Sequence, residues 1–245
     1  MLRKARLLDV SESEPVLDSV RIPLQELHSR KNELPANSET VLVADVASAA
    51  ADAVELLRSW GYRAYLTSDF SHGDSGVLRL WNPNPWLADV VASVTPGNAL
   101  DLGCGTGREA VFLASCGWKV TAVDRLPDAL QMGKALERNY LHGSAVKWEL
   151  ADIRSHEVEP VFDLVISCFA WSTSIPERVR SATRPEGRVL IETHSRVHKA
   201  RFGKPRHAIC APDLCSEFSD WHVQHCSENW RESGRHTVRL LATRP

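Results

Sequence analysis

The sequence lacks the features that mark several large protein classes. No apolar run approaches the roughly 18 residues of a membrane-spanning helix. The first residues, Met1 to Arg6, lead into an acidic segment instead of the apolar core of a signal peptide. Net charge is only -2, from 29 basic and 31 acidic residues, so no overall positive field attracts nucleic acid or an anionic membrane. We therefore expect a cytoplasmic protein without a membrane partner, and a nucleic-acid partner is disfavoured.

Cysteine is sparse and irregularly spaced. The six cysteines contain no C-x-x-C pair, and this spacing does not indicate a disulfide framework in a chain of 245 residues. A denser set of donors that zinc accepts lies near the C-terminus: His207, Cys210, Cys215, His222, His225 and Cys226. Its spacing matches no zinc-binding motif, so no metal site is predicted.

The composition that is present is that of a folded globular protein. Hydrophobic residues make up 43% of the chain and charged residues 24%, which is too apolar for a disordered protein. The length of 245 residues allows one large domain, or a domain of ordinary size with a smaller one attached.

The first 68 residues predict a small α/β domain. Apolar, β-branched segments indicate strands at 7–10, 40–45 and 63–66. A short helix is expected between Ile22 and Pro35, and a longer one from Ala47 to Trp60, where Gly61 is a natural stop. The polar residues 69–77 are typical of a linker.

Residues 78–245 predict a second, larger α/β domain. A helix is expected near 87–93. Strands are expected at 99–102, 119–123, 146–150, 162–167, 188–192, 221–225 and 237–242, with helices after the first, second, fourth and fifth. Strands that alternate with helices favour a parallel, doubly wound sheet of Rossmann type. The last two strands, with no helix between them, favour an antiparallel hairpin at its edge.

A glycine-rich turn follows the first strand of this second domain. The segment Asp101-Leu102-Gly103-Cys104-Gly105-Thr106-Gly107 has the spacing G-x-G-x-G. Glycines allow positive φ angles and let the backbone approach a ligand closely. A dinucleotide fingerprint, G-x-G-x-x-G, needs a third glycine at the position of Arg108. An ordinary turn and a nicotinamide-dependent oxidoreductase remain as alternatives, the second disfavoured by the spacing.

This segment resembles, residue for residue, the first motif of class I S-adenosylmethionine (SAM) dependent methyltransferases. The resemblance implies SAM as the cofactor. It also implies that the turn formed by Gly103, Cys104, Gly105 and Gly107 contacts the methionine and ribose parts, with Asp101 near the ammonium group.

Further cofactor contacts are expected at the ends of the next strands. Asp124 ends the second strand, about 20 residues after the turn, where doubly wound folds use a carboxylate to bind ribose hydroxyls. A simple helix-capping role for Asp124 is the alternative. The resemblance implies that Arg125 lies beside the adenine, that Asp152 and Ile153 contact it, and that Cys168 lies on the same rim.

The acceptor side is less clear. Trp171, Glu192, His194 and the basic segment 201–206 lie beyond strand ends, where they could bind substrate, and Trp171 and His194 are the candidate substrate residues. His194 has a side chain whose ordinary pKa suits a general base, although a solvated or hydrogen-bonded histidine is the alternative. No catalytic residue is assigned, because positioning and desolvation supply much of the rate of a methyl transfer. No Asp-Pro-Pro-Tyr segment follows the fourth strand, which disfavours a nucleic-acid substrate.

Three outer segments are similar to tellurite-resistance and thiopurine-like small-molecule methyltransferases. They are residues 80–85, 184–193 and 201–206. The resemblance implies a small-molecule acceptor, such as a thiol, a chalcogen oxyanion or a hydroxyl compound. A non-catalytic SAM-binding or scaffold protein, which binds partners through its first domain, is the alternative.

The first 68 residues resemble a shortened rhodanese domain at 7–10, 22–24 and 55–62. Rhodaneses carry a persulfide on a cysteine after the central strand, but this chain has Asp45 there. The following Val46-Ala47-Ser48-Ala49 lacks the glycine and arginine residues that cradle the persulfide. We therefore expect a degenerate domain without sulfur transfer, which is available to bind a protein partner.

Overall fold

The structure is a computed structural model, and it describes residues 3–4, 7–12, 14–46, 48–155, 159–205 and 207–245. Ala47 and Arg206, which belong to segments discussed above, lie outside the described residues. Internal contacts divide the chain into two units, Met1–Pro83 and Asn84–Pro245, and each is described by itself.

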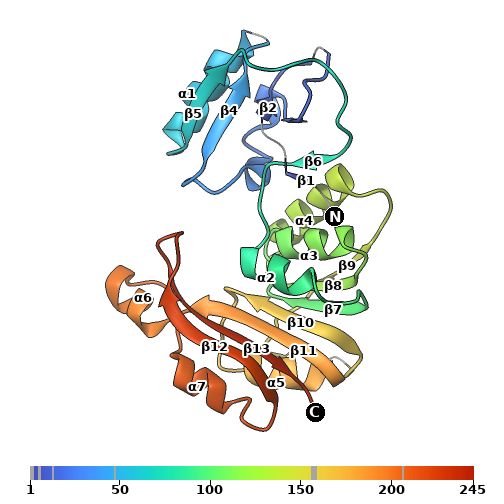
Figure 1. Cartoon of the computed structure of the whole chain (residues 1–245), viewed down its shortest axis with the longest axis vertical. Coiled ribbons are helices and arrows are strands. Elements are labelled where there is room, and N and C mark those ends of the chain that lie inside the picture. Colours follow the sequence, from blue (N-terminus) through green and yellow to red (C-terminus); the bar gives the residue numbers. More distant parts are fainter. Residues whose placement is uncertain (1–2, 5–6, 13, 47, 156–158, 206) are drawn as a thin grey trace. The chain divides into compact units, whose positions relative to one another are not determined.

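The first unit is built on a parallel sheet of order β3-β2-β4-β5 (Figure 1). Its strands are β2 (Leu7–Asp9), β3 (Ser19–Arg21), β4 (Thr40–Ala44) and β5 (Arg63–Thr67). Its helices are α1 (Ala49–Ser59) and two 3-10 helices, η1 (Leu24–Glu26) and η2 (Lys31–Glu33). A separate pair of strands, β1 (Arg3–Lys4) and β6 (Leu78–Arg79), runs parallel. The expected strands and the longer helix are confirmed, whereas β3 was not predicted.

The core of this unit follows from the spacing of apolar residues on α1. Ala50, Ala53, Val54 and Leu57 are buried on one helical face, and they belong to the same core as the inward side chains of β4 and β5. The single short helix expected near residues 22–34 is wrong: the chain forms η1 and η2, separate 3-10 turns. Both are three residues long, as is usual for this helix type.

The segment expected to be a linker contacts the first unit. Leu17 donates its backbone N–H to the carbonyl of Ser71 at 2.8 Å, and Gly73 donates to the carbonyl of Pro15 at 2.9 Å. Farther along, Leu78 is buried in the core of this unit. The chain therefore stays attached to the first unit through residue 78.

The second unit contains a sheet of order β12-β13-β11-β10-β7-β8-β9, counted over the described residues. Its strands are β7 (Asn98–Leu102), β8 (Lys119–Asp124), β9 (Val146–Leu150), β10 (Phe162–Cys168), β11 (Thr183–His194), β12 (His222–Trp230) and β13 (His236–Thr243). Its helices are α2 (Pro85–Val91), α3 (Arg108–Ser115), α4 (Pro127–Tyr140), α5 (Ile175–Ala182), α6 (Arg196–Phe202) and α7 (Ala211–Ser216). Strands β7 to β11 pair in parallel, and β13 is antiparallel to both β11 and β12.

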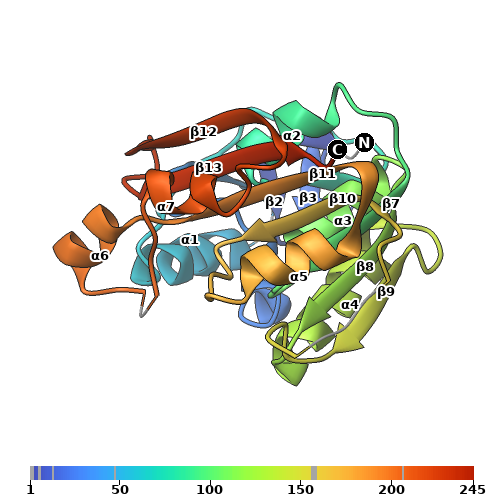
Figure 2. The same ribbon diagram turned by 90° about the horizontal axis from the view of Figure 1, so that it is seen from below.

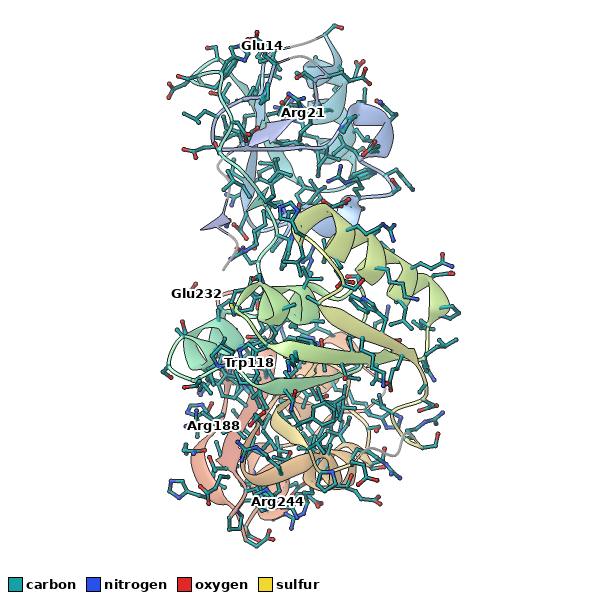
Figure 3. The ribbon with its side chains drawn as sticks, turned by 90° about the vertical axis from the view of Figure 1, so that its right-hand side faces the viewer. Glu14, Arg21, Trp118, Arg188, Glu232 and Arg244 are labelled. Atoms are coloured by element: carbon teal, nitrogen blue, oxygen red, sulfur yellow. A yellow bond between two sulfur atoms is a disulfide. The ribbon has the colours of Figure 1, made fainter. Side chains whose placement is uncertain are left out.

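This arrangement confirms the α/β methyltransferase-type fold with a mostly parallel sheet and a C-terminal antiparallel hairpin. Helices α5 and α7 cover one face of the sheet and α3 and α4 the other, as Figures 1 and 2 show. Apolar residues of β7, β10, β11 and β13 pack against α5 and α7 in one continuous core. On the chain segment before β8, Trp118 is fully buried (Figure 3).

The strands predicted at 188–192 and 221–225 are both longer in the structure. β11 begins at Thr183 instead of residue 188, after a register irregularity between Phe162 and Leu164 of β10. β12 begins at His222 and continues to Trp230, which lengthens the hairpin. β11 is thus extended at its amino end and β12 at its carboxyl end.

The cysteines form one bond that the spacing did not predict. Cys215 of α7 and Cys226 of β12 form a disulfide, whereas Cys104, Cys116, Cys168 and Cys210 are free. In the described segments, no three or more His, Cys, Asp or Glu side chains are grouped as metal ligands. A search of the described helices finds none with the length and apolarity that a membrane crossing requires.

Candidate functional site

The glycine turn between β7 and α3 has the backbone conformation that only glycine adopts easily. Gly103, Gly105 and Gly107 have φ angles of 77°, 54° and 79°. A Cβ at Gly103 would lie 2.1 Å from the Cβ of Ala170, and one at Gly107 would lie 2.4 Å from the indole of Trp148. These two glycines are therefore required by packing within the protein.

Gly105 differs from its two neighbours. A Cβ at this position would have no atom within 4 Å, so the turn faces open space there. The φ of 54° itself favours glycine here. The open space leaves room for a ligand to approach the backbone closely.

The carboxylate of Asp124 connects this turn to the end of β8. Its Oδ2 accepts the backbone N–H of Gly105 at 2.8 Å, and its Oδ1 accepts that of Leu126 at 2.9 Å. Leu126 is the N-cap residue of α4, so the helix-capping role is present. A carboxylate has about four acceptor positions, and two therefore remain for ligand hydroxyls.

Asp101 is the buried charge of the site. Its side chain is at the carboxyl end of β7, only 1% exposed, and its Oδ2 has no hydrogen-bond partner among the described residues. Burial raises the pKa of this carboxyl well above its ordinary value, and the nearby Glu109 and Asp124 raise it further. A buried acceptor without a donor fits a cationic group of a ligand.

Next to this carboxyl, on neighbouring strands, Cys168 and Glu192 lie side by side in the register of β10 and β11. Asn84 bridges them: its Nδ2 donates to Glu192 Oε2 at 2.8 Å and lies 3.6 Å from the Cys168 sulfur. Glu192 Oε1 also accepts from Thr237 Oγ1 at 2.8 Å, and it forms an ion pair with Arg239, whose Nε lies 3.0 Å away. The carboxylate is therefore held in place by Asn84, which precedes α2, and by two side chains of β13.

Asn84 was missed by sequence reasoning. Its Oδ1 also accepts the backbone N–H of Trp86 at 3.0 Å and caps α2, with Pro85 in the first turn. The dipeptide Asn-Pro before a helix is a known start signal, and this signal was available in the sequence. What the sequence did not reveal is that the same side chain reaches Glu192.

The two cysteines of the site are neutral thiols. Burial raises the pKa of both Cys104 and Cys168, and nearby carboxylates raise it further: Asp101 chiefly for Cys104, and Glu109 chiefly for Cys168. A thiolate is the reactive form of cysteine. Neither side chain therefore acts as a nucleophile here, and both line the site as small apolar groups.

The structure brings Ile153 to the glycine turn. Its Cδ1 lies 3.9 Å from the position of a Cβ built at Gly103. Asp152, by contrast, pairs with Arg154 on the surface, and hydrogen bonds from Arg154 are the main cause that lowers its pKa. Arg125 is exposed beyond β8.

On the acceptor side, Trp171 packs beside the core that α5 and α7 share with the sheet. His194, the last residue of β11, has its ring 5.0 Å from that of Phe169. Burial is the first cause that lowers the pKa of His194 to about 4, followed by the charges of His198 and Arg235. His194 is therefore neutral at pH 7 and a weak base.

One cavity of the second unit lies elsewhere. It has a volume of about 620 Å³ and is lined by Asn98, Lys119, Val146 and Phe162, at the amino ends of the strands. Ligands of open α/β sheets bind at the carboxyl ends. The cavity is therefore on the edge opposite to Asp101.

The sequence of the second unit is similar to sequences of known methyltransferases. The family model described as "Methyltransferase domain" matches residues 99–190. Hemagglutinin 1 of Eikenella corrodens is 34% identical over 131 residues, 51% of this chain and 42% of that protein. The "Probable S-adenosyl-L-methionine-dependent methyltransferase TehB" of Haemophilus influenzae is 28% identical over 96 residues, 39% of this chain and 32% of that protein. The chain thus spans less than half the length of these curated relatives.

Solved structures share the fold at low identity. The crystal structure of TehB from Haemophilus influenzae superposes with a TM-score of 0.56 at 21% identity, over 66% of this chain and 63% of that one. The 1,6-didemethyltoxoflavin-N1-methyltransferase of Burkholderia thailandensis, solved with its substrate and S-adenosylhomocysteine, gives 0.51 at 19% identity, over 65% and 76%.

The matched residues contain the glycine turn, Asp101, Asp124 and Cys168, and the matched fold contains the sheet edge on which they meet. TehB is named as SAM-dependent, and the open position at Gly105 and the unpartnered oxygen of Asp101 fit such a ligand. Residues 99–190 of the second unit thus match a methyltransferase domain, and the unit shares its fold with the methyltransferases named above.

Proposed function

We propose that the protein transfers a methyl group from SAM to a small-molecule acceptor: a thiol, a chalcogen oxyanion or a hydroxyl compound. The observation that carries the proposal is the buried Asp101, whose unpartnered oxygen lies at the same sheet edge as the open backbone of Gly105. An uncompensated buried carboxylate is costly, and a cationic ligand group removes that cost.

Each residue of this edge has a role in holding the cofactor. Asp101 accepts from the ammonium group, and Asp124 uses its two remaining acceptor positions on the ribose hydroxyls. Gly105 gives room for close approach, and Ile153 offers apolar contact. Arg125 and Asp152 flank the adenine side. When bound, SAM supplies an electrophilic methyl group. The chain's own contribution is to position both reactants and to exclude water.

The acceptor side supports a small molecule. TehB and the toxoflavin enzyme resemble the second unit in fold, and the latter's name specifies a small-molecule substrate. Neutral His194 is the last residue of β11, near the rim that carries Cys168 and Glu192, and Trp171 follows β10. A neutral imidazole can accept a proton from a thiol or hydroxyl acceptor, although its lowered pKa makes it a weak general base.

We also propose that the first unit is a degenerate rhodanese-like domain that binds a protein partner. Its sheet is parallel, and Asp45 follows β4 at the position where a rhodanese carries its cysteine. A cavity of about 390 Å³ there is lined by Glu14, Asp45, Val46, Phe70 and His72; Glu14 is labelled in Figure 3. A carboxylate cannot carry a persulfide, so binding is the remaining role. Location in the cytoplasm stays a prediction.

Calorimetry with SAM, S-adenosylhomocysteine and NAD tests the cofactor. We expect micromolar binding of the first two and none of NAD. Tighter binding of NAD than of SAM would contradict the proposal. A screen of thiols, phenols, selenite and tellurite, followed by S-adenosylhomocysteine release, then tests transfer. Cofactor binding without turnover on any acceptor would instead favour the scaffold alternative.

A further inference from the structure

A row of aromatic and imidazole rings leads away from the carboxyl end of β10. The row, here called the ring row, consists of Phe169, His194, His198, Phe202 and Trp230. Ring centroids are 5.0 Å apart for Phe169 and His194, 4.2 Å for His194 and His198, and 4.6 Å for His198 and Phe202. Phe202 meets Trp230 edge to face at 6.4 Å. The row thus runs from the strand that carries Cys168 to α6 and β12.

The inner end of the ring row is fixed in an unusual conformation. Phe169 has a φ angle of 64°, which is rare for a bulky side chain. Its backbone N–H donates to the carbonyl of Glu192 at 2.7 Å, which holds it beside the candidate site. Such conformations cost free energy and cluster at functional sites.

The outer end of the ring row is open to solvent. Phe202 is 50% exposed and Trp230 is 44% exposed. Large aromatic side chains offer flat surfaces on which planar molecules stack. Stacking of this kind requires a planar acceptor, and a small oxyanion such as selenite or tellurite gains nothing from it.

Two arginines add positive charge along the ring row. The Arg235 guanidinium lies 5.0 Å from the Phe169 ring, and that of Arg201 lies 4.9 Å from Trp230 and 5.5 Å from Phe202. Over the residues that the structure describes, neither guanidinium forms an ion pair with a carboxylate. Guanidinium groups in this setting bind carboxylates, often with two parallel hydrogen bonds.

The other charged groups around the ring row are engaged or neutral. Glu228 accepts the backbone N–H of Ala211 at 2.8 Å and lies 3.8 Å from His236. Burial, and after it the charge of Arg235, lowers the pKa of His198. Glu232, an exposed residue of the hairpin turn, carries a negative charge that opposes the positive charges of the two arginines (Figure 3). Arg201 and Arg235 are nevertheless cations that lie against the rings of the row.

We infer that the acceptor is a planar aromatic molecule with an anionic group, which stacks on the ring row and pairs with Arg201 or Arg235. The inference rests on the proposed function, because it names the class of acceptor for the same site. The ring row starts at Phe169, next to Cys168 on the edge that carries Asp101, so a molecule stacked on its inner end has its acceptor atom on the cofactor side.

Binding of non-reactive probes to the full chain tests the inference. Calorimetry compares 2-naphthoate with 2-naphthamide, which lacks the charge, and with decahydronaphthalene-2-carboxylate, which lacks the plane. Titrations are made with and without S-adenosylhomocysteine. We expect 2-naphthoate to bind about tenfold more tightly than either analogue. Equal affinities for the three probes would overturn the inference.

Variants assign the affinity to the ring row. Trp230→Ala, and Arg201→Gln combined with Arg235→Gln, are each expected to weaken 2-naphthoate binding about tenfold. Trp230→Phe should retain most of it, because a ring remains. Arg138→Gln, an exposed arginine of α4, is the matched control and should change nothing.

The outcomes separate this inference from the proposed function. If S-adenosylhomocysteine binds but Trp230→Ala leaves 2-naphthoate affinity unchanged, the acceptor class is wrong and the methyltransferase proposal stands. If selenite binds as tightly as 2-naphthoate and does not depend on Trp230, the inference is also overturned. If S-adenosylhomocysteine does not bind at all, the proposed function fails, and the probe titrations without it still decide the character of the ring row.

Discussion

Replacement of Asp101 by asparagine should stabilise the ligand-free protein and weaken SAM binding at the same time. The side chain is 1% exposed, its Oδ2 has no partner among the described residues, and burial raises its pKa. Asparagine has nearly the same shape but no charge to desolvate. The charges of Glu109 and Asp124, which raise the pKa of Asp101, do not repel a neutral amide.

The expected magnitudes follow from the cost of an unsatisfied buried group. A buried neutral polar atom without a partner costs about 1 to 3 kcal/mol, and a buried charge costs more. Asparagine keeps the unpaired polar atom but removes the charge, so we expect a gain of about 1 to 2 kcal/mol in the free energy of unfolding. For a domain of this size the melting temperature then rises by about 2 to 8 °C. A lost hydrogen bond to a charged group weakens binding by about 1.5 to 3 kcal/mol. SAM affinity should therefore fall about 10-fold to 100-fold.

The sign of the pH dependence gives an independent check. Burial raises the pKa of Asp101 in the folded state, so the folded protein binds the proton of this carboxyl more tightly than the unfolded chain does. The resulting contribution to the free energy of unfolding is fully present below the unfolded pKa of about 3.9 and is lost as pH rises through the folded pKa. The advantage of Asp101→Asn should therefore be largest at neutral pH and disappear in acid.

Differential scanning fluorimetry without ligand and calorimetry with SAM measure the two effects. Glu137→Gln is the matched control. Glu137 is a buried carboxylate of the same unit, and it accepts from the backbone of Ala145 and Val146 and from the indole of Trp148 at 2.7 to 2.9 Å. Its replacement should destabilise the protein without changing SAM affinity. A lower melting temperature for Asp101→Asn, or an unchanged SAM affinity, would refute the reasoning.

Three further predictions use the same assays. Asp124→Ala should reduce SAM affinity at least about tenfold by removing charge-assisted bonds to ribose, and an unchanged dissociation constant would show that the carboxylate only caps α4. Gly105→Ala should weaken SAM binding with a modest loss of stability, whereas Gly107→Ala should destabilise the fold by collision with Trp148; equal thermal losses would contradict this. Neither the unmodified chain nor Asp45→Cys should form thiocyanate from thiosulfate and cyanide, and any such activity would show that the first unit transfers sulfur.

The fold was predictable where sequence signals are local. Alternation of apolar strands with helices predicted β7 to β11 and the C-terminal hairpin, and the absence of a helix signal after Leu150 agrees with the described residues of that segment. The ends of β11 and the pairing of Cys215 with Cys226 were not predicted. Both depend on contacts between segments that are distant in sequence, which periodicity does not encode.

The two halves of the candidate site differ in how well the sequence predicted them, because one depends on local patterns and the other on contacts between distant segments. The cofactor edge is carried by one contiguous motif and by strand ends whose position a parallel sheet dictates, so Asp101, Gly105 and Asp124 were identified from sequence. The ring row takes its members from the residue after β10 and from β11, α6 and β12. His194 was identified as a candidate, and so was Phe202 within the basic segment 201–206. Phe169 and Trp230 were missed, because no local pattern indicates that they lie along one path.

Charge separates the two halves of the site in a way that suits the proposed reaction. Asp101, Glu109 and Asp124 make the cofactor edge acidic, whereas Arg201 and Arg235 make the ring row basic. The acidic edge attracts the cationic cofactor and repels an anionic acceptor. The basic ring row attracts the anionic acceptor and repels the cofactor. Transfer of the methyl group removes the sulfonium charge, because the sulfur of the product is neutral. The attraction to the acidic edge therefore falls once the reaction has occurred, and the product is held less tightly than SAM by the charge on these carboxylates.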